Sequence, residues 1–99
     1  PPYYRLVYVY LKNHNEALLD QMAVVMADKL RAVFGNRVLG PDKPPVARIQ
    51  TLFIKKIVVK IEQNAPMGRA RELLLRIQRE MIEDERYKSL IVYYDVDPM

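Results

Sequence analysis

Few side chains in this sequence could carry out a chemical reaction. The only histidine, His14, lies between two asparagines, and the chain contains no cysteine. A cysteine nucleophile, a disulfide and a Cys-based zinc site are therefore excluded. Ser89 and Thr51 have no base nearby in the sequence, and no G-x-x-x-x-G-K phosphate loop occurs. We interpret His14 as a solvated turn residue and expect no catalytic residue and no metal site in this chain.

Two aspartates near the end of the chain offer one further possibility. Asp95 and Asp97 stand two positions apart, so an extended backbone places them on the same face, where they could bind a cation. No further ligand lies near them in the sequence. The alternative is structural: Asp97 and Pro98 end a strand, and Asp95 pairs with a base such as Arg48.

Tyrosine and lysine side chains supply clearer binding chemistry. In the first predicted strand, Tyr4, Tyr8 and Tyr10 fall on the face opposite a set of valines and a leucine. The same alternation in the second long strand points Lys56 and Lys60 outward. Aromatic rings interleaved with ammonium groups on an open sheet are typical of surfaces that stack nucleobases and neutralise phosphates. The predicted nucleic-acid-binding residues are Tyr8, Tyr10, Lys55, Lys56 and Lys60.

The same face also carries apolar side chains, which favour a different interpretation. Leu6, Ile54 and Val58 are expected to point outward beside the tyrosines. Such a surface is typical of a protein contact, in which the tyrosines pack against another part of the parent protein. Both interpretations remain open at the level of the sequence.

Two arginines at the start of the second predicted helix indicate an anion site. Arg69 and Arg71 lie in its first turn, where the helix dipole disfavours cations. Charges placed against that preference suggest an external anion, such as a phosphate or an acidic peptide. Further along, Glu72 and Arg76 have the i,i+4 spacing of a solvated, salt-bridged helix face.

Hydrophobic periodicity and turn residues predict the elements that hold these side chains. Two helices can cover only one face of a sheet of this size. We therefore predict an α+β fold, a two-layer split β-α-β (ferredoxin-like) sandwich with two helices on one face of a four-stranded, mainly antiparallel sheet and a short extra strand. The first predicted elements are a strand over 4–12 and a helix that Asn13 caps, with Glu16 in its first turn, and that Gly35-Asn36 ends. A short extended piece over 37–41 and a proline loop follow, and then strands over 46–50 and 53–62. The last elements are a helix that begins at Asn64-Ala65-Pro66 and ends at 83–85, and a strand over 90–95.

Composition and charge limit the class of protein. The 99 residues are 51% hydrophobic and 28% charged, which suits one small globular domain. A net charge of +4 and a pI near 9.4 permit a nucleic-acid partner without requiring one. No apolar run approaches the roughly 18 residues of a membrane span. The start at Pro1-Pro2 shows neither an initiator Met nor a charged leader, and we expect a single domain over 1–99 cut from a larger cytoplasmic protein.

Several short segments together resemble a known family. They are Arg37-Val38-Leu39-Gly40-Pro41, Pro45-Val46-Ala47-Arg48, the ending Asp95-Val96-Asp97-Pro98 and the opening Pro1-Pro2-Tyr3. In that combination, over essentially the whole chain, the sequence resembles the C-terminal domain of the primosomal protein N′ (PriA) family of replication-restart helicases.

This resemblance implies a bacterial, nucleoid-associated parent protein that is an ATP-dependent 3′–5′ DNA helicase. The family recognises stalled or abandoned replication forks and promotes primosome assembly and replication restart. ATP, Mg and zinc are expected in the upstream domains, and no cofactor is expected in this fragment. The implied partners are branched or single-stranded DNA, the upstream helicase lobes and the acidic C-terminal tail of single-stranded DNA-binding protein. By position, Arg69 is the expected partner of the tail carboxylate, with Arg71 beside it, because a guanidinium can grip a carboxylate through two parallel hydrogen bonds.

The sequence thus predicts a domain without enzymatic activity that docks DNA and protein partners. The alternative is a structural module that buttresses the motor lobes and makes no DNA contact of its own. Salt dependence separates the two, because DNA contact through lysines weakens steeply as salt rises.

Overall fold

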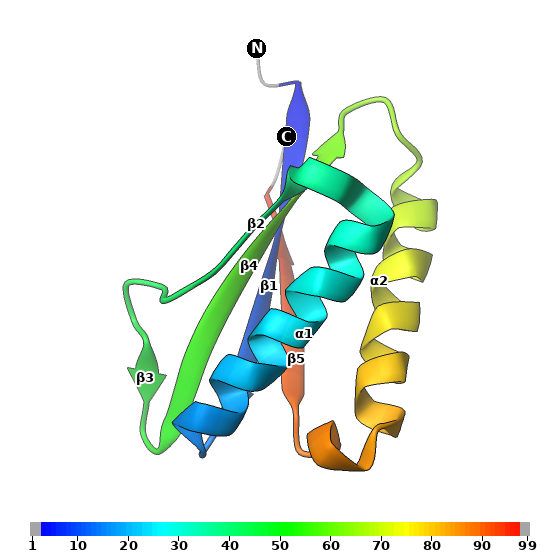
Figure 1. The fold of residues 1–99 in the computed structure, drawn as a ribbon. Helices are drawn as coiled ribbons and strands as arrows, with labels where there is room; N and C mark the ends of the chain where they lie inside the picture. Colours follow the sequence, from blue (N-terminus) through cyan, green and yellow to red (C-terminus); the bar gives the residue numbers. More distant parts are fainter. Residues whose placement is uncertain (1–2, 98–99) are drawn as a thin grey trace.

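The computed structural model places two helices on one face of an antiparallel β-sheet (Figure 1). It describes residues 3–97, so Pro1, Pro2, Pro98 and Met99, and with them the predicted strand end at Pro98, lie outside the described residues. In chain order the elements are β1 (Tyr4–Asn13), α1 (Glu16–Phe34), a 3₁₀ turn (Gly35–Arg37), β2 (Val38–Asp42), β3 (Arg48–Ile49), β4 (Leu52–Glu62), α2 (Met67–Glu83), a second 3₁₀ turn (Glu85–Tyr87) and β5 (Ile91–Val96).

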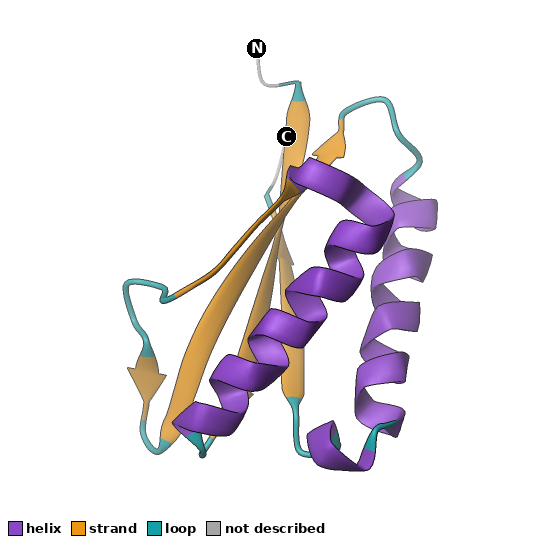
Figure 2. Cartoon of the chain, viewed as in Figure 1, coloured by secondary structure: helices purple, strands orange, loops and turns teal. Residues whose placement is uncertain are grey.

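The strand order confirms the predicted sandwich. Four strands follow one another as β2-β4-β1-β5, and the short β3 pairs with β4 beside this path. All of these pairings are antiparallel. Both helices lie on the same side of the sheet, and within residues 3–97 the opposite face carries no helix (Figure 2). The chemistry of that uncovered face therefore depends on the outward side chains of the strands.

The helix-facing side of the central strands β1 and β4 forms the core. Val7, Val9 and Leu11 are at most 1% exposed, as the alternation in β1 predicts. Ile57 and Val59 of β4 are fully buried on the same side. Burying each such side chain contributes about 1.5–3 kcal/mol, so this layer fixes which face of each strand points outward. The helices add Leu19, Met22, Ala23, Met26, Ala27, Leu30, Ala70, Leu74, Ile77 and Met81 to the core.

The cap of α1 differs from the prediction. Asn15, not Asn13, is the N-cap residue, and its side-chain oxygen accepts a 3.0 Å hydrogen bond from the backbone nitrogen of Leu18. Asn13 is only 6% exposed, and its Oδ1 accepts a 2.9 Å bond from the backbone nitrogen of Asn15. Its Nδ2 donates to the carbonyl and hydroxyl oxygens of Ser89, at 3.2 and 3.1 Å. A buried amide needs such partners, so Asn13 instead ties the end of β1 to the turn before β5.

Backbone geometry explains the edge formed by β2 and β3. Gly40 adopts a φ of 104°, and a Cβ at this position would lie 2.9 Å from the carbonyl oxygen of Lys56, so only glycine fits. The predicted extended piece is confirmed as β2. The predicted strand over 46–50 is too long, because only Arg48 and Ile49 pair with β4. Gln50, with a φ of 56°, and Thr51 instead form the turn into β4.

The second helix begins after a proline, as predicted. Pro66 is the N-cap residue of α2 and has a φ of −66°. Beyond the helix, Tyr87 is 2% exposed and joins the core, which the sequence does not predict. Its hydroxyl accepts a 3.3 Å hydrogen bond from Nε2 of Gln21 on α1. Within residues 3–97, neither helix combines the length and hydrophobicity needed to cross a membrane.

Candidate nucleic-acid and peptide docking surfaces

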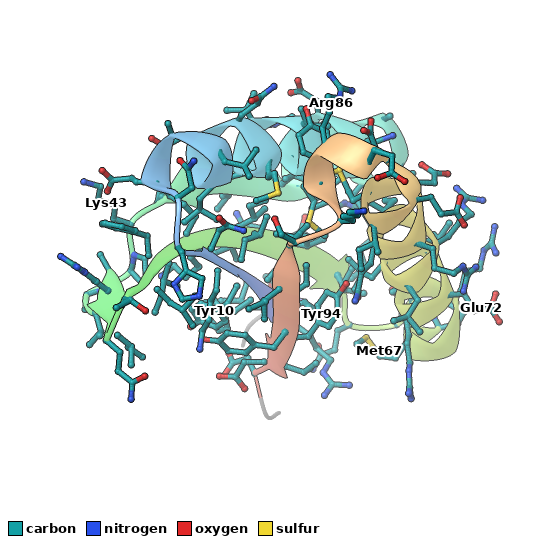
Figure 3. The ribbon with its side chains drawn as sticks, turned by 90° about the horizontal axis from the view of Figure 1, so that it is seen from below. Tyr10, Lys43, Met67, Glu72, Arg86 and Tyr94 are labelled. Atoms are coloured by element: carbon teal, nitrogen blue, oxygen red, sulfur yellow. The ribbon has the colours of Figure 1, made fainter. Side chains whose placement is uncertain are left out.

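The uncovered side of the sheet gathers tyrosines and lysines from three strands. Tyr10 of β1 lies opposite Lys56 of β4 on one side and Tyr93 of β5 on the other. Lys12 lies opposite Ile54, two residues along. Figure 3 shows Tyr10 on the side of the sheet away from α1. We call this surface the open face; its tyrosines and lysines are Tyr4, Tyr8, Tyr10, Lys12, Lys56, Lys60 and Tyr93.

The rings and ammonium groups of the open face contact one another. The rings of Tyr10 and Tyr93 stack with centroids 4.8 Å apart and an interplanar angle of 14°. Tyr8 lies 6.5 Å from Tyr10, with a tilt of 31° between the rings. The lysines lie over rings as well, with Nζ to centroid distances of 4.7 Å for Lys12 over Tyr93, 5.5 Å for Lys56 over Tyr8 and 5.8 Å for Lys60 over Tyr4.

Acidic residues lie among the cross-strand neighbours of this group. Glu62 lies opposite Tyr4, and its carboxylate is ion-paired with Arg37. Asp95 lies opposite Tyr8 on β5, and Asp42 lies opposite Lys56 on β2. Both aspartates are on edge strands, whereas the three lysines are on the two central strands. The lysines of the open face therefore lie on its central strands, with the two aspartates on the strands at either edge.

Lys55 does not join the other predicted binding residues. It lies on the helix-facing side of β4, where its ammonium pairs with Oδ1 of Asp20 on α1 at 3.2 Å. Its side chain is only 17% exposed. The structure thus brings together Tyr8, Tyr10, Lys56 and Lys60 and places Lys55 on the other side of the sheet.

Ile54 points to the open face but is not exposed there, contrary to expectation. It is 3% exposed because the segment 44–49 folds over this end of the face. A shallow hollow of about 280 Å³ remains between that segment and the stacked tyrosines. Leu6 and Val58, the other apolar residues predicted on this face, are half-buried. The apolar part of the open face is therefore smaller than the sequence suggests.

Two residues of the open face were missed by the sequence analysis. Lys12 continues the alternation of Tyr8 and Tyr10, so the period of the strand could have identified it. Tyr93 is exposed to 38% and joins the group only through the pairing of β5 with β1. Burial and the neighbouring Tyr10 and Asp95 raise the pKa of Tyr93 above its ordinary value.

The two predicted anion-binding arginines have different surroundings. Nη1 of Arg69 lies 3.3 Å from Oε2 of Glu72, so Glu72 pairs with this arginine and not with Arg76 as predicted. Arg71 instead lines an apolar cavity of about 490 Å³ between β5 and the start of α2. In Figure 3, Met67 lies at this end of α2 and Glu72 on its outer side. The cavity is lined by Val7, Met67, Gly68, Arg71, Leu74, Leu75, Tyr94 and Val96.

A second side chain of this cavity links the edge strand to the helix. The hydroxyl of Tyr94 donates a 2.7 Å hydrogen bond to Oε1 of Gln78 on α2. Burial raises the pKa of Tyr94 to about 12. Arg71 is thus the only charged residue that lines this largely apolar cavity among the described residues.

The residues considered for catalysis or metal binding are not assembled into a reactive group. The His14 ring nitrogen Nδ1 lies 3.0 Å from the hydroxyl of Thr51, and both residues are exposed. The predicted pair of Asp95 and Arg48 does not form, because Arg48 lies over the ring of Phe53. In the part of the chain that the structure describes, no three His, Cys, Asp or Glu side chains are grouped so that they could hold a metal ion.

These features define a small α+β domain of the split β-α-β type with two candidate docking surfaces, the open face and the cavity beside α2. The chain belongs to the family described as the primosomal protein N C-terminal domain, whose model matches residues 1–99. This match confirms the family predicted from the sequence.

Two known proteins are similar to this chain, one in sequence and one in fold. The chain is 28% identical over 100 residues to the replication restart protein PriA of Bacillus subtilis (strain 168), and the match covers 99% of this chain. It spans only 12% of the length of that relative. The fold also resembles the de novo designed protein Foldit4, with a TM-score of 0.67, 11% identity and coverage of 97% of this chain and 98% of the other. The second likeness shows the fold alone.

Proposed function

We propose that this domain is a docking module of a replication-restart protein and that its open face contacts DNA. The observation that supports the proposal is the concentration of Lys12, Lys56 and Lys60 on the uncovered side of the sheet, with tyrosine hydroxyls beside them. Ammonium groups neutralise phosphates and release counterions, which is the main source of sequence-independent DNA affinity. The net charge of +4 acts in the same direction.

The parent protein is proposed to be an ATP-dependent DNA helicase that acts at stalled replication forks. The relative's name, replication restart protein, supports this role. ATP, Mg and zinc would bind elsewhere in that parent, and the domain described here would position DNA and partners for it. Its contribution would be binding and orientation, without a chemical step.

Salt dependence tests the DNA contact quantitatively. Three phosphate contacts predict a slope of log affinity against log salt of about −2.7 for duplex DNA and about −2 for a single strand. Affinity should therefore fall roughly 40-fold for a duplex between about 50 and 200 mM salt. The measurement is fluorescence anisotropy of the chain with forked and single-stranded DNA.

Charge-matched variants show whether the open face is responsible. Lys56→Ala/Lys60→Ala should reduce the magnitude of the duplex slope by about 1.8. Lys29→Ala/Lys88→Ala removes the same charge from the helix side and the turn before β5, where these lysines pair with Glu80 and Glu85. That control should leave the slope within about 0.5 of the wild-type value. Equal effects of the two double variants would contradict a specific role for the open face.

We also propose that the cavity beside α2 receives an acidic peptide tail, as the family resemblance implies. An apolar cavity with one guanidinium at its rim fits a peptide that ends in a large apolar residue and a free carboxylate. Arg71 is better placed for this role than Arg69, because Glu72 competes for the Arg69 guanidinium.

A labelled acidic peptide with a C-terminal phenylalanine tests this second surface. The free-acid peptide should bind more tightly than its C-terminal amide, and Arg71→Ala should weaken binding more than Arg69→Ala. The expected loss for Arg71→Ala is about 10- to 150-fold, since a charge-assisted hydrogen bond contributes roughly 1.5–3 kcal/mol. Equal binding of the acid and the amide would exclude recognition of the carboxylate.

A structural role in supporting the motor lobes is the alternative function. The exposed apolar side chains of the edge strands favour it, because Ile91 is 47% exposed, Val96 is 39% exposed and Leu39 is 45% exposed. A domain with only this role would bind neither forked nor single-stranded DNA at any salt concentration. The DNA titration therefore separates the two functions.

A further inference from the structure

The tyrosine rings of the open face already contact one another or a lysine. Tyr10 and Tyr93 lie directly opposite each other on neighbouring strands, and their ring centroids are 4.8 Å apart. This separation equals the usual spacing of adjacent strands, about 4.8 Å. With an interplanar angle of 14°, the two rings stack with one face of each toward the other.

The lysines occupy further ring surface. Nζ of Lys12 lies 4.7 Å from the centroid of Tyr93, which also stacks on Tyr10. Tyr93 therefore has two partners already, an ammonium group and a ring. Lys56 lies over Tyr8 at 5.5 Å, and Lys60 lies over Tyr4 at 5.8 Å. A nucleobase that stacks on the contacted side of one of these rings must displace an ammonium group or a neighbouring ring.

Losing these ring contacts offsets part of the affinity that base stacking would add. Stacking of one base on an aromatic side chain is worth roughly 5- to 150-fold in affinity. Displacing a lysine costs about 2- to 5-fold, and separating a stacked tyrosine pair costs about 2- to 12-fold. A phosphate, in contrast, can approach the ammonium groups and the phenol hydroxyls at the ring edges while every ring contact is kept.

We infer that the open face binds the sugar–phosphate backbone and does not stack bases, an inference that rests on the DNA contact proposed above. Lys12, Lys56 and Lys60 neutralise phosphates, and ring hydroxyls such as that of Tyr93 donate hydrogen bonds to phosphate oxygens. The stacked rings hold the ammonium groups in a fixed pattern on the sheet. This mode accepts any base sequence and differs from the stacking platform that the sequence suggests.

An abasic strand tests the inference directly. The probes are a labelled single-stranded oligonucleotide and a strand of the same length and phosphate number that lacks its bases. The two strands should bind the chain within about 3-fold of each other at low salt, with equal salt slopes. Binding of the abasic strand more than about 3-fold weaker would overturn backbone recognition, because a single stacked base is worth at least about 5-fold.

Two variants of one tyrosine provide an independent measurement. Tyr93→Phe keeps the ring and removes only the hydroxyl, whereas Tyr93→Leu removes both. In the backbone mode, Tyr93→Phe loses about 2- to 12-fold, the value of one hydrogen bond, and Tyr93→Leu loses at least as much. Wild-type affinity for Tyr93→Phe with a large loss for Tyr93→Leu would instead establish stacking and refute the inference.

Failure of the inference can be distinguished from failure of the proposed function. If neither the normal nor the abasic strand binds at low salt, the DNA contact itself is wrong and the backbone mode is wrong with it. If the normal strand binds with the expected salt slope but the abasic strand does not, only the backbone mode is refuted. Equal binding of both strands supports both statements.

Discussion

Replacement of Tyr94 by phenylalanine should weaken the domain by about 1 kcal/mol at neutral pH, the usual contribution of one hydrogen bond. The Tyr94 hydroxyl donates a 2.7 Å bond to Oε1 of Gln78, which joins the edge strand β5 to α2. Phenylalanine keeps the ring that packs against the core, so the substitution removes the bond alone.

The same hydroxyl should produce a distinct alkaline signature. Burial raises the pKa of Tyr94 from 10.0 to about 12 in the folded protein. Between these two pH values the unfolded chain loses a proton that the folded chain keeps, so the folded state binds more protons and stability falls as the pH rises. A difference of two pKa units corresponds to about 2–3 kcal/mol when the transition is complete.

Urea unfolding followed by circular dichroism at pH 9 and at about pH 12 measures both effects. The Tyr94→Phe variant should be less stable than the wild type by about 1 kcal/mol at the lower pH and more stable by about 1 kcal/mol at the higher pH. Other tyrosines and lysines titrate in both proteins, so their contributions cancel in the difference. Tyr3→Phe is the control, because Tyr3 is 74% exposed, and its curve should run parallel to that of the wild type. A Tyr94→Phe curve that also runs parallel would refute the role assigned to this hydroxyl.

Three further predictions concern the fold around the docking surfaces. Gly40→Ala should lower the free energy of unfolding by about 1–3 kcal/mol, because the residue has a φ of 104° and an added Cβ would lie 2.9 Å from a backbone atom. Gly68→Ala is the control, because no atom lies within 4 Å of its added Cβ. In the same chemical denaturation assay it should be neutral or stabilising by up to about 1 kcal/mol. Asn13→Ala should lower the free energy of unfolding, measured by thermal denaturation, by about 2–3 kcal/mol, because it removes a 6% exposed amide that makes three hydrogen bonds. A decrease below about 0.5 kcal/mol would contradict the role of Asn13 in joining β1 to the turn before β5. Hydrogen bonds from Arg86 lower the pKa of Asp84 to about 2. In the Arg86→Met variant, an NMR titration should show the pKa of Asp84 return toward 3.8. An unchanged pKa would exclude Arg86 as the cause.

Strand alternation predicted most of the open face correctly. Val7 and Val9 are buried in β1, and Lys56 and Lys60 point to the opposite side of the sheet, as their positions require. The same alternation places Lys55 on the helix side, where it pairs with Asp20. Its inclusion among the predicted binding residues followed from its charge and not from the period of the strand.

Predictions that depended on distant segments were less accurate. Ile54 has the predicted orientation but is 3% exposed, because segment 44–49 folds over it. Asn13 has the right chemistry for a helix cap, yet its amide bonds to Ser89, which follows it by 76 residues. No local pattern identifies such partners, since they depend on how the loops return to the sheet.

The sequence by itself determined the elements, the apolar faces of the strands and the family, because helical and strand periods and turn residues are properties of short segments. Only the tertiary structure decided which outward side chains lie next to one another. The stacking of Tyr10 on Tyr93 and the position of Lys12 over Tyr93 depend on the register between β1 and β5. That register is fixed by packing across the whole sheet, and it turns separate tyrosines and lysines into one surface.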